Sequence, residues 1–244
     1  MNPRPTFNPD LLEFYATSTY PCSYLEGRTA RSQVASSGWP IGDAPYALLI
    51  EQGFRRSGTY IYRPHCDDCQ ACTSIRIPVA AFQANRSQQR AWSQHADLLS
   101  SASAPWFSEE HFALYSRYQK ARHGSGGMDH DDAEQYANFL LGSQVSTRLV
   151  EFRSPATGEL PGPLRMVSII DQLEQGLSAV YTFYDPEPGL SLGTFNVLWQ
   201  IRLARAMRLK YLYLGYWIKD CNKMAYKSRF QPHELYRNGV WTAS

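Results

Sequence analysis

The sequence predicts an α+β protein in which an antiparallel-rich mixed sheet is flanked by helices. The sequence predicts three strands, at residues 148–152, 165–170 and 176–184. Two short turn segments separate them, the first rich in Pro and Gly and the second polar. Such short connections imply antiparallel neighbours. An apolar helix over 192–209 then precedes a last strand over 211–218, in which successive side chains alternate between the two faces of the sheet.

Two helices are expected before these strands. Ser108 is placed to cap a helix that runs to about 122, and a second helix covers 131–141. The glycine-rich stretch 123–130 between them reads as a loop. The resulting order, two helices, three strands, a helix and a strand, is that of a GNAT-type acyltransferase core, and this analogy concerns the fold alone.

The N-terminal part of the chain is expected to form a smaller domain. The small-residue run Ser100–Pro105 predicts a linker, which divides the chain into a Cys-containing domain at 1–105 and a GNAT-like domain at 106–244. Strands are expected at 60–62 and 74–79 in the first domain. The 244 residues are enough for either one large domain or two small ones.

Charge is distributed unevenly along the chain. Residues 188–244 contain nine basic and two acidic side chains, whereas the preceding segment 97–187 is strongly acidic. This polarity favours contact with a polyanion, although the two segments could also neutralise each other in the fold. No apolar run approaches the roughly 20 residues that span a bilayer, and the first residues lack the apolar stretch of a signal peptide. We therefore expect a cytoplasmic protein without a membrane partner.

Four of the five cysteines lie in the N-terminal third. Cys66, Cys69 and Cys72 follow a C-x2-C-x2-C spacing, with Cys22 or His65 available as a fourth ligand. This pattern could hold zinc or an iron–sulfur cluster, while free reduced thiols are the alternative. Disulfides are not expected in a cytoplasmic protein.

The segment between the expected strand at 176–184 and the long helix is the strongest candidate for substrate contact. Ser191 is placed as the N-cap of the helix, and Gly193 permits close approach to the backbone. The stretch Leu190–Thr194 has no basic residue, so it makes a poor cradle for a coenzyme A pyrophosphate. The substrate-binding candidates in this half of the chain are Tyr181, Ser191, Leu192, Gly193, Thr194, Tyr213 and Tyr216.

Several short stretches, taken in order, resemble the arginyl-tRNA–protein transferase family, and most closely its short bacterial branch. They are Pro21–Leu25, Arg28–Arg31, Tyr62–Cys66, Ser74–Pro78, Gly126–Asp129, Tyr184–Pro186, Ser191–Thr194, Tyr213–Ile218 and Lys223–Lys227. The eukaryotic pattern begins with a C-x-x-C pair, and here the second position is Leu25 while Cys22 remains. This departure fits the bacterial branch and argues against a eukaryote-like iron–sulfur site.

The resemblance implies a reaction and a set of partners. An amino acid, leucine in the bacterial branch and arginine in eukaryotes, would pass from aminoacyl-tRNA to the N-terminal amine of a protein that begins with Asp or Glu, which marks that protein for degradation. The aminoacyl ester is already activated, so no cofactor is required. Asp185 or Asp171 is the expected base. Arg28, Arg76 and Lys223 would pair with the acidic acceptor, and tRNA phosphates would contact Lys219, Lys223, Lys227 and Arg229.

Three other functions are compatible with parts of the sequence. Arginyl transfer by the same mechanism keeps the family and changes only the donor. A coenzyme A-dependent N-acyltransferase shares the fold analogy and lacks the basic phosphate loop. A metal-stapled RNA-binding module would use the four N-terminal cysteines and predicts strongly salt-dependent RNA binding without acyl transfer.

Overall fold

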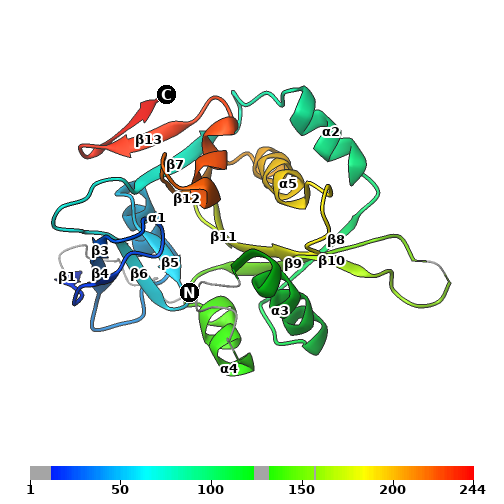
Figure 1. Cartoon of the computed structure of the whole chain (residues 1–244), viewed down its shortest axis with the longest axis horizontal. Helices are drawn as coiled ribbons and strands as arrows, with labels where there is room; N and C mark the ends of the chain where they lie inside the picture. Colours follow the sequence, from blue (N-terminus) through cyan, green and yellow to red (C-terminus); the bar gives the residue numbers. More distant parts are fainter. Residues whose placement is uncertain (1–11, 124–131, 157) are drawn as a thin grey trace, which may run out of the picture.

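The structure is a computed structural model that describes residues 12–123, 132–156 and 158–244. Its centre is an eight-stranded sheet that is mixed, because β11 and β12 are parallel and all other neighbours are antiparallel (Figure 1). The strands follow in the spatial order β14 (Val240–Ala243), β13 (Glu234–Arg237), β7 (Thr73–Pro78), β12 (Tyr211–Trp217), β11 (Gly176–Tyr184), β10 (Leu164–Gln172), β9 (Thr147–Arg153) and β8 (Leu99–Ser103).

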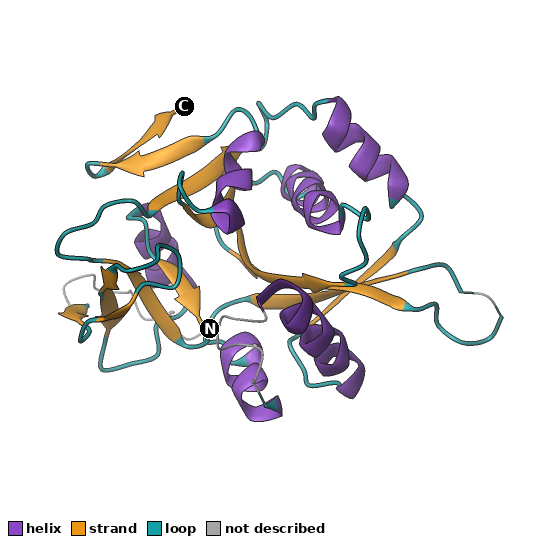
Figure 2. Ribbon diagram, viewed as in Figure 1, coloured by secondary structure: helices purple, strands orange, loops and turns teal. Residues whose placement is uncertain are grey.

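Helices cover both faces of this sheet (Figure 2). The helices α2 (Arg86–Gln94) and α5 (Leu192–Ala206) pack on one face, whereas α3 (Glu109–His123), α4 (Ala133–Tyr136) and the π-helix Ala137–Leu141 cover the other. Alternation along β10 explains how one strand serves both faces: Val167 packs with the α3 side and Met166 with the α5 side. The central strands are therefore buried on both sides.

A smaller layer lies beside the part of the large sheet that contains β7 and β12 (Figure 1). It contains the helix α1 (Asp43–Glu51), a four-stranded sheet and a two-stranded sheet. Tyr46 and Leu49 of α1 share a buried cluster with Tyr213 of β12, so this layer packs directly on the large sheet. The four-stranded sheet has the order β1 (Glu13–Ala16), β4 (Ser32–Ser36), β6 (Tyr60–Pro64) and β5 (Arg55–Ser57), and the other pairs β2 (Tyr20–Pro21) with β3 (Thr29–Ala30).

After β12 the chain forms two short helices before it enters β13. These are α6 (Asn222–Ala225) and the 3-10 helix η4 (Tyr226–Arg229). They lie close to β12 and carry much of the basic, aromatic segment that the sequence singles out.

The predicted fold class is confirmed, and so are the order and approximate bounds of the elements predicted between 108 and 218, whereas strands β13 and β14 were not predicted. The expected linker at Ser100–Pro105 was wrong, because most of it forms the edge strand β8, which pairs with β9. The boundary at 105 does not separate two sheets either. Strand β7, from the N-terminal part, lies between β12 and β13 in the middle of the large sheet. The expected loop at 123–130 lies, apart from its first residue, outside the described residues.

None of the helices within the described ranges is both long enough and apolar enough to cross a membrane.

Candidate functional site

The two parallel strands of the large sheet separate along their length. Strands β11 and β12 are paired at only three positions, from Gly176 opposite Tyr211 to Ser178 opposite Tyr213. Both strands continue beyond this point, β11 to Tyr184 and β12 to Trp217, without pairing to each other. The sheet therefore opens into a wedge whose walls carry unshared backbone groups, and we call this region the β11–β12 wedge.

Arg55 lies in this wedge. Its Nη2 donates a hydrogen bond of 3.0 Å to the carbonyl oxygen of Val180 on β11, and its guanidinium lies 5.8 Å from the centre of the Tyr216 ring on β12. Gly215 makes room for it, since a Cβ at that position would collide with the guanidinium, and its positive φ of 75° suits glycine. Arg55 thus spans the two separating strands.

The wedge opens into a large cleft of about 1860 Å³ between the sheet, the small N-terminal layer and the α6–η4 segment. Among the described residues that line it there is no Asp or Glu, whereas ten cationic side chains do so. At least Arg31 and Arg56 are paired with carboxylates that lie outside the lining. The cleft is therefore electropositive and suits an anionic ligand. The ten are Arg28, Arg31, Arg55, Arg56, Arg63, Arg122, Lys223, Lys227, Arg229 and Arg237.

Tyrosines form much of the remaining wall. Burial, before any other influence, raises the pKa of the Tyr24 and Tyr226 phenols to about 12, so both hydroxyls stay protonated at neutral pH. Tyrosine rings offer flat surfaces on which nucleobases can stack, and their neutral hydroxyls can donate hydrogen bonds to phosphates. The lining tyrosines are Tyr15, Tyr20, Tyr24, Tyr60, Tyr62, Tyr118, Tyr181, Tyr184, Tyr216, Tyr226 and Tyr236.

The N-terminus of α5 forms another part of the wall. Ser191 occupies the predicted N-cap position with a positive φ of 51°, although its side chain makes no capping hydrogen bond. The first backbone hydrogen bond into the helix runs from Phe195 to the Ser191 carbonyl. The amides before Phe195 therefore have no acceptor within the helix, and this end carries a partial positive charge. Gly193 and Thr194 line the cleft here.

Lys227 differs from the surface lysine that the sequence suggested. It is only 6% exposed, and its Nζ donates 2.6 Å to the carbonyl oxygen of Tyr216 at the end of β12. Burial, and next the nearby Arg55 guanidinium, lower its pKa to about 7. The expected contact of Lys227 with tRNA phosphates was therefore wrong, because its ammonium group is enclosed and partly neutralised.

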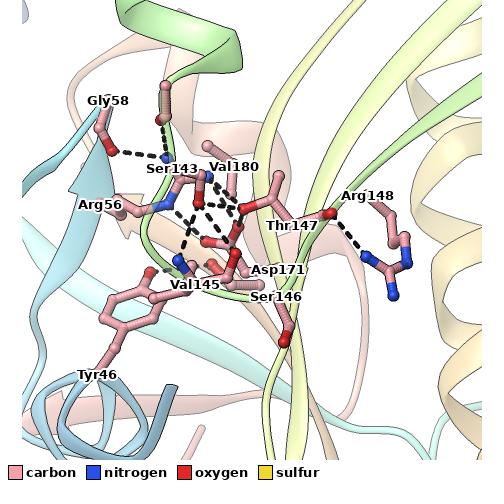
Figure 3. A network of polar contacts seen from close by, with 12 residues as sticks. Tyr46, Arg56, Gly58, Ser143, Val145, Ser146, Thr147, Arg148, Asp171 and Val180 are labelled. Carbon is pink, nitrogen blue, oxygen red and sulfur yellow. Dashed lines mark hydrogen bonds and ion pairs between the residues drawn. The ribbon is translucent and has the colours of Figure 1, made fainter. Parts of the chain in front are cut away.

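The two expected bases do not reach the cleft. Asp171 is fully buried and accepts hydrogen bonds from Arg56 at 2.8 and 3.0 Å and from the Thr147 hydroxyl at 2.6 Å (Figure 3). Arg56 also donates 3.0 Å to the carbonyl oxygen of Gly142, so its bonds to Gly142 and Asp171 anchor the small layer to the large sheet. Asp185 pairs with Arg165 at 3.3 Å and is likewise absent from the cleft lining. Asp171 is thus a structural ion-pair partner.

Arg76 is not placed to receive an acidic substrate. Two carboxylates already occupy its guanidinium, Glu234 at 2.6 Å and Glu51 at 2.7 Å. The group lies 3.6 Å above the Tyr211 ring and is buried outside the cleft lining. Tyr213 is also buried there, where its hydroxyl donates to Glu51. Both residues therefore join α1 to the large sheet, and the expectation that they contact substrate was wrong.

The other predicted residues are divided between cleft and core. Leu192 is 1% exposed and packs in the core, and Lys219 is exposed and lies outside the lining. The structure brings together in one cleft Arg28, Tyr181, Ser191, Gly193, Thr194, Tyr216, Lys223 and Arg229.

The four N-terminal cysteines all line the cleft. Burial, then the neighbouring thiols with Cys22 first among them, raise the pKa of Cys72 to about 12. No group of three or more Cys, His, Asp or Glu is arranged to hold a metal within the described ranges. The thiols as placed here do not fit a metal, so no step is derived through one.

Some cleft residues had no signal in the sequence. Arg55 is one of two adjacent arginines, and nothing marks which of them faces the wedge. Asn196 reads as an ordinary polar position on an apolar helix, although it is 4% exposed and lines the cleft. Arg122 ends a helix and lies 5.7 Å over the Tyr184 ring. Each becomes visible only when distant segments are brought together.

The chain matches two family models. The model described as "Arginine-tRNA-protein transferase, C terminus" matches residues 110–237, which is more than half of the chain, and its N-terminal counterpart matches residues 20–90. The chain belongs to this family. Family membership thus covers both the small N-terminal layer and the large sheet, and so both sides of the cleft.

Curated relatives in the arginine-tRNA-protein transferase family match nearly end to end. An aspartate/glutamate leucyltransferase of Chromobacterium violaceum is 53% identical over 94% of this chain and 93% of its own length. The enzyme of the same name from Nitrosospira multiformis is 51% identical over 94% of this chain and 90% of its own. That of Hahella chejuensis is 42% identical, with coverages of 94% and 96%.

More distant likenesses exist among solved structures. FemX is 10% identical, with a TM-score of 0.45 over 86% of this chain and 81% of its own. L-PGS from Bacillus licheniformis is 11% identical, with a TM-score of 0.46 and coverages of 84% and 68%.

Proposed function

We propose that this protein transfers leucine from leucyl-tRNA to the N-terminal amine of proteins that begin with Asp or Glu. The observation that carries the proposal is the electropositive cleft: ten basic side chains line it, of which Arg31 and Arg56 are ion-paired and Lys227 is partly neutral, and no carboxylate does so among the described residues. Both substrates are anionic, one through its phosphates and the other through its first side chain. The relatives that match the chain nearly end to end are aspartate/glutamate leucyltransferases.

The reaction requires the protein to position the two substrates and to stabilise charge, and it does not require a nucleophilic side chain. The aminoacyl ester is already activated, and a terminal α-amine has a pKa of about 7.7–8.0, so a useful fraction is neutral near physiological pH. The neutral amine attacks the ester carbonyl, an amide bond forms and the ester C–O bond breaks, and the proton lost by the amine passes to the departing ribose oxygen of the tRNA. Holding amine and ester together can supply several kcal/mol of the barrier reduction. No carboxylate base from the described cleft is needed for this step.

Charge develops on the ester oxygen as the amine attacks. Two kinds of donor face the wedge where we place this oxygen: the free amides at the N-terminus of α5 and the guanidinium of Arg55. Fixed donors of this kind stabilise a developing oxyanion without reorganisation. We assign contacts with the tRNA phosphates and the acidic acceptor side chain to Arg28, Lys223 and Arg229, which are exposed cations of the cleft.

The cellular setting follows from the substrates. Aminoacyl-tRNA is a cytoplasmic metabolite, so we place the reaction in the cytoplasm, where an added leucine marks the acceptor protein for degradation. No cofactor is assigned to the reaction.

A transfer assay tests this function. Peptides that begin with Asp, Glu, Lys or Ala are each offered leucyl-tRNA and arginyl-tRNA, and the product is identified by mass spectrometry. Leucine on the Asp and Glu peptides alone is the expected result. Arginine on the same peptides would keep the family and change the donor. No transfer from either donor would refute the proposal.

A further inference from the structure

An unpartnered hydrogen-bond acceptor lies beside the N-terminus of α5. Asn196 is 4% exposed and lines the cleft one turn into the helix. Its Nδ2 donates 2.8 Å to the hydroxyl oxygen of Thr182 on β11, and its Oδ1 has no hydrogen-bond partner. A buried amide oxygen without a partner costs free energy, so this atom is a position at which a ligand donor would be favoured.

A chain of polar side chains holds Asn196 in this orientation. The Thr182 hydroxyl lies 3.3 Å from that of Ser168 on β10, and the Gln200 Nε2 donates 3.1 Å to Ser168. Ser168 and Gln200 are fully buried beneath the cleft. Asn196 lines the cleft, and this chain uses its Nδ2 while its Oδ1 stays without a partner. The chain thus holds an acceptor in a cleft whose charged side chains, among the described residues, are all cationic.

Two complementary features therefore stand side by side. The amides before Phe195 offer donors, and the Asn196 oxygen, one turn away, offers an acceptor. An α-aminoacyl group has the matching pattern, since its carbonyl oxygen accepts and its α-ammonium group, on the adjacent carbon, donates. A simple acyl group or a phosphate has nothing to give to the acceptor.

We propose that the N-terminus of α5 and the side-chain oxygen of Asn196 together bind the α-aminoacyl group of the donor, with Asn196 accepting a hydrogen bond from the α-ammonium group. This inference rests on the proposed function and names the part of the donor that the site recognises. It also explains why the acceptor is an amide. A carboxylate here would bind the ammonium group more strongly, and it would repel the donor phosphates in a cleft that must hold them.

Binding of two matched analogues tests the proposal. The first is 3′-deoxy-3′-(L-leucylamino)adenosine, which mimics the end of leucyl-tRNA with a stable amide. The second carries a 4-methylpentanoyl group in place of leucyl and so lacks only the α-amine. Calorimetry on the full-length wild-type protein is expected to show about 10- to 100-fold tighter binding of the first, as for a hydrogen bond to a charged group.

Variants assign this preference to Asn196. Asn196→Leu is expected to bind the two analogues about equally, while its affinity for the amine-free analogue stays at the wild-type value, which shows that the site is folded. Asn196→Asp is expected to keep the preference. Asn222→Leu, the same substitution at an exposed residue elsewhere in the cleft lining and outside this polar chain, is the matched control and is expected to keep it as well.

Three results would overturn the inference: equal binding of both analogues by the wild type, an unchanged preference in Asn196→Leu, or no binding of either analogue. The outcome is separate from that of the transfer assay. A protein that prefers the amine-bearing analogue through Asn196 but transfers leucine to no peptide would retain this site and lose the proposed function.

Discussion

Arg55 donates a hydrogen bond to the carbonyl oxygen of Val180 at the point where β11 and β12 separate. The bond joins the small N-terminal layer to the large sheet in the wall of the cleft. It also fixes a cation against backbone that the sheet leaves unpaired.

Loss of the Arg55 charge is expected to impair catalysis directly. In Arg55→Met, leucine transfer under single-turnover conditions should fall by about 100- to 1000-fold, as when a preorganised donor to an oxyanion is removed. Arg90→Met, an exposed position on α2 outside the cleft, is the control and should keep the wild-type rate. A wild-type rate in Arg55→Met would show that the wedge cation takes no part in transfer.

A side chain at Gly215 is expected to lower both stability and activity, because it would collide with the Arg55 guanidinium. Gly215→Ala should cost about 1–2 kcal/mol for the positive φ of 75° and should also displace Arg55, so transfer falls with stability. Gly239→Ala has the same kind of strain, with φ of 82°, and open space around its Cβ. It should lose similar stability in urea unfolding and keep its activity. Equal transfer activity in both variants would show that the absence of a side chain at Gly215 is not needed for the reaction.

Asp171 is expected to act on stability and not on the reaction. Asp171→Asn leaves the Arg56 guanidinium buried without its counter-charge, which should lower the free energy of unfolding by about 3–5 kcal/mol in urea titrations. Transfer per folded molecule at low temperature should stay near the wild-type value. A large loss of activity in fully folded Asp171→Asn would restore this carboxylate as a catalytic group.

Much of the large sheet could be predicted because its pattern is local. The alternation in 176–184 and 211–217, with short turns before them, reflects strands that pack between helices. The edge strand β8 escaped prediction for the opposite reason, since its small exposed residues resemble a linker and only pairing with β9 defines it. The domain boundary failed because β7 pairs with strands more than 130 residues away in the chain.

The site was less predictable because burial decides which charges are free. The sequence does not distinguish Arg76 from Arg28. In the structure Arg76 forms ion pairs with two glutamates, whereas Arg28 lines the cleft. Asp171 gains its partner from a strand 115 residues away. Lys227 belongs to a basic segment that reads as a surface, and only the packing of η4 against β12 encloses it.

Lys227 gives the protein a distinct pH dependence of stability. Its pKa falls from the usual 10.5 to about 7 on folding, so between these values the unfolded chain binds more protons and stability rises with pH. Lys227→Met should therefore be more stable than the wild type near pH 7, with the advantage shrinking toward pH 10. Urea unfolding across pH 6–10 measures this difference. A constant difference over that range would contradict the lowered pKa.

The most direct test of the electropositive cleft compares two acceptors that differ only in charge. Peptides beginning with Asp and with Asn are incubated with the purified protein and leucyl-tRNA, and kcat/KM for leucine addition is measured for each. We expect efficient transfer to the Asp peptide and at least about tenfold less to the Asn peptide, because a charged hydrogen bond is lost. Equal transfer to both peptides, or transfer to neither, would contradict the binding of an acidic acceptor by the cleft.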